Sequence, residues 1–101
     1  MSDDLNQIHI PPSFVAVHAD ARGRLRMPRD AFHQRYELCE DLAQTLVEHA
    51  QAVHHDQGVA QDDVLARIQA GLASADARLD PAEALWVVTR LAELLGWPAP
   101  G

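Results

Sequence analysis

Three side chains near the middle of the chain have types that could carry metal or thiol chemistry. His33 and Glu37 are four residues apart, so on a helix they share one face, and Cys39 is the single thiol of the sequence. Imidazole, carboxylate and thiolate are all ligands of zinc. A small metal- or thiol-dependent enzyme using His33, Glu37 and Cys39 is therefore one hypothesis for this chain.

The expected helical positions of these residues weigh against that hypothesis. His33 and Glu37 fall on a polar face, where two hard ligands more often make an adventitious site than a specific one. Cys39 falls at the centre of an apolar face and is expected to be a small core residue. A reactive thiolate needs a cationic neighbour or a helix N-terminus, and the adjacent Glu40 has the wrong sign. We therefore predict no metal, no cofactor and no catalytic residue.

Nucleotide chemistry is excluded by what the chain lacks. All eight of its positive charges are arginine, so there is no lysine for a phosphate site. The five glycines are scattered, and they form neither a P-loop nor a dinucleotide-binding fingerprint. No serine lies in a GxSxG-type turn, so the usual serine nucleophile is absent too.

Charge is distributed unevenly along the chain. Its formal net charge is −7, which disfavours nucleic acid and anionic membranes as partners. Residues 21–36 nevertheless hold five arginines against one acid, and eleven acids face three arginines from Glu37 onward. We expect this arm, Arg22–Arg35, to pair with the protein's own acidic helices or with an acidic partner. A weak nucleic-acid binder through the arm is a second alternative.

Helical patterns fill the chain from residue 28 onward. Residues 29–57 contain no proline or glycine and carry a broad apolar stripe that includes Leu38, and Gly58 is a natural stop. A second helix is expected over 61–73. A third begins at Asp80-Pro81, with Glu83 completing a capping-box pattern, and ends before Gly96. The expected inward face of the third helix is Ala84, Leu85, Val88, Leu91, Ala92 and Leu95.

The N-terminal part is expected to be extended. Residues 14–18 predict a short strand, residues 20–23 a turn, and residues 24–27 alternate in polarity, so a small hairpin follows. A single helical turn after Pro12 is the alternative. The predicted fold is an all-α bundle of one long and two shorter helices with this hairpin-like segment. Residues 1–12 form a flexible tail, 13–97 one domain, and 98–101 a second tail.

Trp86 is the side chain that most favours a protein partner. On a helical wheel it points away from the inward face of its helix, beside Arg90, whose guanidinium is placed to stack on the indole. Tryptophan and arginine are enriched at the energetic centres of protein interfaces. The alternative is that Trp86 packs beneath the N-terminal segment. The predicted partner-binding residues are Trp86, Arg90, Leu94, Arg22, Arg24 and Arg26.

The lengths of the expected helices suggest a second copy of the chain as another possible partner. The long helix spans about 40 Å, whereas the two shorter helices span about 20 Å each. Either the short helices cover the long one end to end, or half of its stripe needs the N-terminal segment or a second copy. A homodimer through the long helix is therefore a further prediction.

Three strings resemble a small uncharacterised proteobacterial family of about this length. They are IPPSF at Ile10–Phe14, RYELCEDLA at Arg35–Ala43 and RLAELLGW at Arg90–Trp97. That family is sometimes labelled "ATPase with chaperone activity", and it has no catalytic motif that carries over to this chain. Because the chain lacks a phosphate loop and a lysine, the resemblance implies association with a chaperone ATPase and not ATPase activity.

The sequence thus favours a non-enzymatic protein-interaction module with a protein partner. The N-terminus lacks the basic and apolar regions of a signal peptide. No apolar run approaches the ~20 residues that span a bilayer, and a single cysteine permits no internal disulfide. We therefore expect a cytoplasmic protein without a membrane contact.

Overall fold

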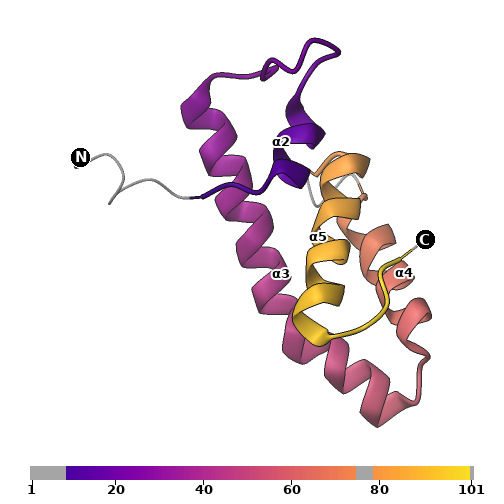
Figure 1. The fold of residues 1–101 in the computed structure, drawn as a ribbon. Coiled ribbons are helices and arrows are strands. Elements are labelled where there is room, and N and C mark those ends of the chain that lie inside the picture. Colours follow the sequence, from indigo (N-terminus) through magenta and orange to yellow (C-terminus); the bar gives the residue numbers. More distant parts are fainter. Residues whose placement is uncertain (1–8, 75–78, 101) are drawn as a thin grey trace.

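The computed structural model describes residues 9–74 and 79–100. Within these residues the chain forms four helices and no strand: α2 (Pro12–His18), α3 (Arg29–Gln57), α4 (Gln61–Leu72) and α5 (Pro81–Leu95). The prediction of an all-α fold is confirmed, and α2, a helix of seven residues, lies where a helical turn after Pro12 was the alternative to a strand (Figure 1). None of the described helices combines the length and apolar character needed to cross a membrane.

The long helix α3 begins and ends where the sequence predicts. Pro28 precedes its first turn, and Gly58 follows its last residue with a left-handed φ of 69°. Only glycine adopts that conformation at little cost, so the helix stops there. The terminal histidines, His54 and His55, lie in the last turn, where a positive charge is favourable.

The start of α5 is fixed by a reciprocal cap. The Asp80 carboxylate accepts a hydrogen bond of 2.8 Å from the Glu83 backbone N–H, and the Asp80 N–H donates back to the Glu83 side chain. This is the capping box that the sequence predicts, with Pro81 as the first helical residue. The cap also fixes the Glu83 carboxylate at the N-terminal end of α5.

The predicted strand over residues 14–18 is wrong, because these residues form α2. Phe14 and His18 are four residues apart, so a helix turns both toward the core, where both are buried. A strand would also place Phe14 and His18 on one face, and it would turn Val15 and Val17 to the opposite face. Tertiary burial has overridden the β-propensity of Val15 and Val17.

The turn expected at residues 20–23 is present. The Gly23 N–H donates to the Asp20 carbonyl over 2.9 Å, and Gly23 has a φ of 81°. Of the expected hairpin, an isolated bridge between Ala19 and Leu25 remains in the described part of the chain. This loop connects α2 to α3 and lies at one end of the molecule (Figure 1).

Two buried clusters lie along α3, and together they cover its stripe. Phe32, Cys39 and Ala43 pack with residues of α2 and α5, whereas Ala50 packs with residues of α4 and α5. The shorter helices lie along one side of α3, so the molecule is elongated, with extents of 48 × 29 × 23 Å (Figure 1). Because α2 covers the first half of the stripe, length alone no longer argues for a dimer. The homodimer stays a prediction.

Two leucines expected on apolar faces are exposed instead. Leu38 of α3 is 41% exposed and Leu85 of α5 is 45% exposed. The expected inward position of Leu85 is wrong because α5 turns Ala84, Val87 and Val88 into the core and leaves Leu85 between them at the surface.

Candidate functional site

A groove opens along one face of α5 and is the candidate functional site. Its cavity volume is about 620 Å³. One stripe of α5 forms its floor, with spacings of three and four residues that place all six side chains on the same face. That stripe consists of Ala82, Leu85, Trp86, Thr89, Arg90 and Glu93.

The opposite wall of the groove comes from the N-terminal segment and α2. Ser13, Ala16 and Val17 of α2 line it, together with Tyr36 of α3. The walls thus bring together two segments far apart in the sequence, and α2 exists as a wall because Phe14 anchors it in the core. Most of the exposed surface that lines the groove is apolar, so the groove suits apolar groups.

Trp86 is packed beneath α2 and is not a surface residue. Its side chain is 7% exposed, and its Nε1–H donates to Ser13 Oγ over 2.9 Å. The Phe14 ring meets the indole edge-on, with ring centroids 5.0 Å apart. The alternative stated from the sequence, packing under the N-terminal segment, is what the structure has. Only the rim of the indole contributes to the groove.

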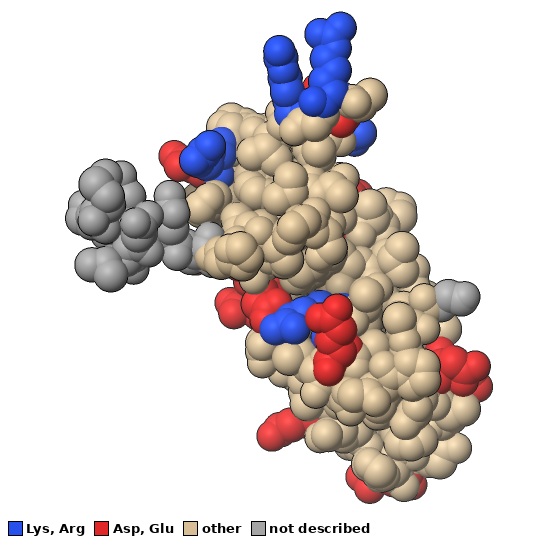
Figure 2. All heavy atoms as spheres, in the orientation of Figure 1, with Lys and Arg blue, Asp and Glu red and all other residues tan. Residues whose placement is uncertain are grey.

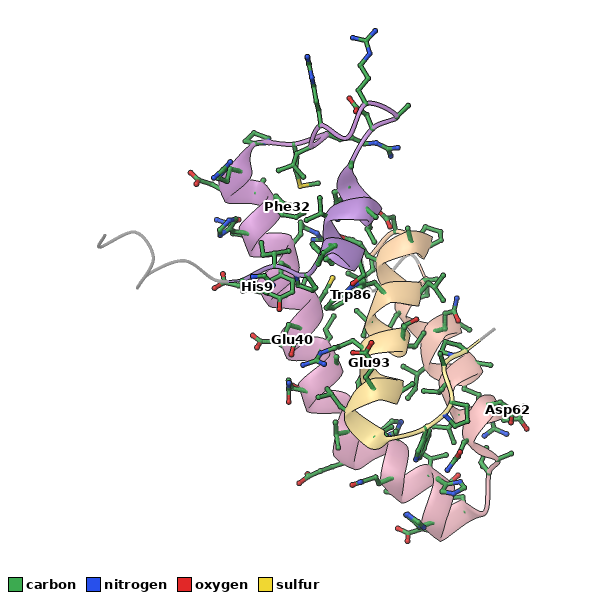
Figure 3. All side chains as sticks on the ribbon, viewed as in Figure 1. His9, Phe32, Glu40, Asp62, Trp86 and Glu93 are labelled. Atoms are coloured by element: carbon green, nitrogen blue, oxygen red, sulfur yellow. The ribbon has the colours of Figure 1, made fainter. Side chains whose placement is uncertain are left out.

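Arg90 does not stack on Trp86 but forms ion pairs at the lower end of the groove. Its Nε lies 3.0 Å from Glu40 Oε1 and its Nη2 lies 3.2 Å from Oε2, so the guanidinium and the carboxylate form a bidentate ion pair. Nη1 also lies 3.2 Å from Glu93 Oε1. The hydrogen bonds that Arg90 donates to the Glu40 carboxylate outweigh the effect of burial and raise the pKa of Arg90. Figure 3 shows Glu40 and Glu93 near each other below Trp86.

The third predicted contact residue of α5, Leu94, is half-buried and packs against the first core cluster. It therefore supports the fold more than it supplies surface. Trp86, Arg90 and Leu94 are the residues of α5 that were predicted to bind a partner. Among them, Arg90 alone presents a polar group at the surface of the groove. Sequence reasoning missed Leu85, whose exposure depends on the rotation of α5 against α3.

Behind the groove lies a buried charge network that the sequence did not predict. The Glu83 carboxylate is 2% exposed and accepts from Arg35 Nε over 2.9 Å. His18 Nε2 lies 2.8 Å from the same oxygen, and because an ionised carboxylate only accepts, this nitrogen carries the proton. Burial acts to raise the pKa of Glu83, but the bonds from Arg35 and His18 outweigh it, so the pKa is lowered.

The network contains atoms of the kind that ligate metal ions, but its charge does not suit a cation. Within the described residues, one atom each from His18, Asp80 and Glu83 lies within 4.8 Å of the others. Both Glu83 oxygens, however, accept from the Arg35 guanidinium, with Nη2 at 2.5 Å from Oε1. A metal ion there would face a fixed positive charge. The network instead joins α2, α3 and α5.

The metal or thiol triad suggested by the sequence is not assembled. Cys39 has no exposed surface and lies in the first core cluster, while Glu37 is exposed and His33 is half-buried. Burial, with a smaller contribution from the Glu83 charge, raises the pKa of Cys39 to about 12. A thiol with that pKa is protonated at neutral pH and is a poor nucleophile and a poor ligand.

The arginine arm divides into a buried and an exposed part. Arg35 pairs with Glu83, which is the internal pairing expected for the arm. Arg22, Arg24 and Arg26 are exposed on the loop between α2 and α3. Figure 2 shows positive side chains gathered at the loop end of the molecule, with negative side chains along the rest.

Comparisons with protein-family models, curated proteins and solved structures found no match to this chain. The resemblance to the family labelled "ATPase with chaperone activity" stays a prediction.

Proposed function

We propose that this protein is a non-enzymatic interaction module that binds an apolar segment of a partner protein in the groove between α2 and α5. The observation that carries the proposal is Leu85. It is 45% exposed on the floor of an apolar groove, next to the rim of the buried Trp86. An exposed large apolar side chain inside a concave apolar surface gains free energy when a partner covers it.

The dimensions of the groove favour a peptide segment. Its floor runs along α5 from Ala82 to Glu93, about 16 Å at the helical rise. That length accommodates about three turns of an amphipathic helix or about five extended residues. Apolar side chains line its middle and the Arg90–Glu93 ion pair marks one end, which is the pattern of an interface core with a polar rim.

The polar groups of the groove support binding more than catalysis. Ser13 Oγ accepts from Trp86, and Thr89 Oγ1 donates to the Leu85 carbonyl. Arg90 is held by Glu40 and Glu93. The hydroxyls of Ser13 and Thr89 thus each have a structural partner, and neither is paired with a base that would activate it.

Association with a chaperone is the pathway that we propose for this module. Its basis is the resemblance of the strings at Ile10–Phe14, Arg35–Ala43 and Arg90–Trp97 to the family labelled "ATPase with chaperone activity". A groove for apolar segments is consistent with such a role, because chaperone systems handle exposed apolar chain.

Two exposed leucines provide a matched experiment. Leu85→Glu places a charge on the groove floor, and Leu38→Glu makes the same change on α3, outside the groove lining. The tagged wild type and both variants would be used for affinity purification from the lysate of the source organism, with mass spectrometry. We expect a stoichiometric protein partner that wild type and Leu38→Glu retain and Leu85→Glu loses.

Three results would contradict the proposal. A partner kept by Leu85→Glu but lost with Leu38→Glu would move the interface to α3 and would revive the predicted homodimer if that partner were a second copy. If neither wild type nor either variant recovered a stoichiometric protein, the proposal of an interaction module would be wrong. Stoichiometric metal in the purified protein would favour the rival enzyme hypothesis.

A further inference from the structure

We infer that the partner segment is acidic as well as apolar, and that the loop carrying Arg22, Arg24 and Arg26 binds its carboxylates while the groove binds its apolar side chains. The inference rests on the proposed function and names the chemistry of the partner. Three observations carry it: hydrogen bonds hold the loop in one conformation, its arginines have no acidic partner among the described residues, and the loop lies next to the groove.

The loop is built to hold these arginines in place. The Asp20 carboxylate accepts the backbone N–H groups of Arg22 and Arg24 over 2.8 and 3.0 Å. The Arg26 N–H donates to the His18 carbonyl over 2.9 Å, which ties the far side of the loop to the end of α2. All of these bonds use backbone donors, so the three guanidinium groups stay available. A loop ordered in advance loses less entropy when a partner binds.

The three guanidinium groups have no acidic partner within the described part of the chain, where Arg35 and Arg90 are the arginines that form ion pairs. The molecule has a net charge of −7, so acidic side chains were available for internal pairing. Arg22, Arg24 and Arg26 are instead exposed on the loop, and Figure 2 shows positive side chains reaching outward at the loop end of the molecule. Three like charges within five residues of one loop repel each other, and an anionic partner relieves that repulsion.

The loop continues one wall of the groove. Ala16 and Val17 line the groove on α2, which ends at His18, and the loop follows directly from Ala19. Figure 3 shows the loop with its long basic side chains beyond the end of α2, while Trp86 lies beside the same helix lower down. A segment that lies in the groove and runs along α2 therefore reaches the arginines.

An acidic protein segment fits this surface better than nucleic acid does. Non-specific binding to nucleic acid depends on neutralising many phosphates, and three cations on a molecule of net charge −7 give little of it. The apolar surface of the groove beside these cations does not favour contact with a phosphate backbone. Arginine binds carboxylates with a fork of donors, which matches aspartate and glutamate side chains.

The test uses a random library of displayed peptides about 15 residues long, which extend to about 50 Å and so can span groove and loop. The library is selected against the full-length wild type, and selected peptides are then titrated by fluorescence anisotropy. The variants are the triple substitution Arg22→Gln/Arg24→Gln/Arg26→Gln, the groove substitution Leu85→Glu, and the control Arg67→Gln, an exposed arginine of α4. Far-UV circular dichroism confirms that each variant is folded.

We expect the selected peptides to be enriched in aspartate and glutamate beside apolar residues. The triple variant should bind them about tenfold more weakly, and Arg67→Gln as tightly as wild type. Raising NaCl from about 0.05 M to about 0.5 M should weaken wild-type binding and leave the triple variant nearly unchanged. Asp20→Ala keeps every arginine but releases the loop, and it should also weaken binding.

Other outcomes separate the two proposals. If the selected peptides were apolar without acidic enrichment and did not bind Leu85→Glu, the inference of an acidic partner would be wrong. The proposal of an apolar binding groove would stand. Acidic peptides that bind Leu85→Glu as tightly as wild type would overturn a single segment spanning both sites. No enriched peptide would remove both proposals. A short single-stranded DNA that binds as tightly as the peptides and is lost with the triple variant would make the loop a nucleic-acid contact.

Discussion

His18 Nε2 lies 2.8 Å from Glu83 Oε2 across 65 residues of sequence, and both side chains are buried. Arg35 completes the network from α3, so one carboxylate joins three helices. Its position follows from the capping box, in which Asp80 holds the first turn of α5. The wall of the groove therefore depends on a charge inside the protein.

Replacing Glu83 by glutamine should remove the contribution of this side chain to the pH dependence of the free energy of unfolding. The folded pKa of Glu83 is below its unfolded value of about 4.3. Its contribution is therefore fully present above about pH 4.3 and is lost as the pH falls through the folded pKa. We expect Glu83→Gln to cost about 3 kcal/mol at pH 7, and the difference from wild type to shrink below about pH 4.

Urea unfolding between about pH 3 and pH 7 measures this difference. Glu37→Gln, on an exposed position of α3, is the control and should change the free energy of unfolding little at any pH. A constant difference between wild type and Glu83→Gln across this range would show that the charge of Glu83 contributes nothing.

Trp86→Ala should destabilise the isolated protein by about 3–5 kcal/mol, because it removes a core side chain. The indole is 7% exposed and packs against Phe14 of α2. Leu85→Ala, its exposed neighbour, should stay within about 0.5 kcal/mol of wild type. Ser13→Ala removes the acceptor of the indole N–H and should cost about 1 kcal/mol.

Denaturant unfolding followed by far-UV circular dichroism checks all three substitutions. If Trp86→Ala unfolded at the same denaturant concentration as wild type, the indole would be available for a partner, and its predicted role as a contact residue would return.

Cys39 should be unreactive toward a disulfide reagent such as DTNB in the folded protein at pH 8. Its pKa is raised to about 12 by burial, and the side chain has no exposed surface. Only about one thiol in 10,000 is ionised at pH 8, so labelling has to wait for unfolding. In guanidinium chloride the same thiol should react at the rate of a free cysteine. Complete labelling within seconds under native conditions would revive a thiol-dependent activity.

Two glycines should respond in opposite directions to alanine. Gly58 has a φ of 69°, and an added Cβ meets nothing within 4 Å, so Gly58→Ala tests backbone strain alone. We expect it to cost about 1–2 kcal/mol. Gly71 lies within α4 and is equally open to a Cβ, so Gly71→Ala should stabilise by about 0.5–1 kcal/mol. Thermal unfolding of the two variants beside wild type measures both, and equal shifts would contradict the assigned conformations.

The sequence by itself determined the helices whose ends are set by local chemistry. The absence of proline and glycine over residues 29–57, with Gly58 after them, defines α3, and Asp80-Pro81 with Glu83 defines the start of α5. These signals act within a few residues, through backbone donors and allowed dihedral angles, so they can be recognised without the fold. The burial of Cys39 followed in the same way from helical periodicity.

Tertiary structure decided what depends on contacts between distant segments. Residues 14–18 have strand-like composition but form a helix in the fold, where Phe14 packs against Phe32 of α3 and Trp86 of α5. Whether Trp86 or Leu85 is exposed depends on which side of α5 the helix α2 covers, and no local pattern contains that information. The Arg35–Glu83 pair joins α3 and α5 through two residues that are 48 positions apart in the sequence. A buried carboxylate is stable only where the fold brings it a cation.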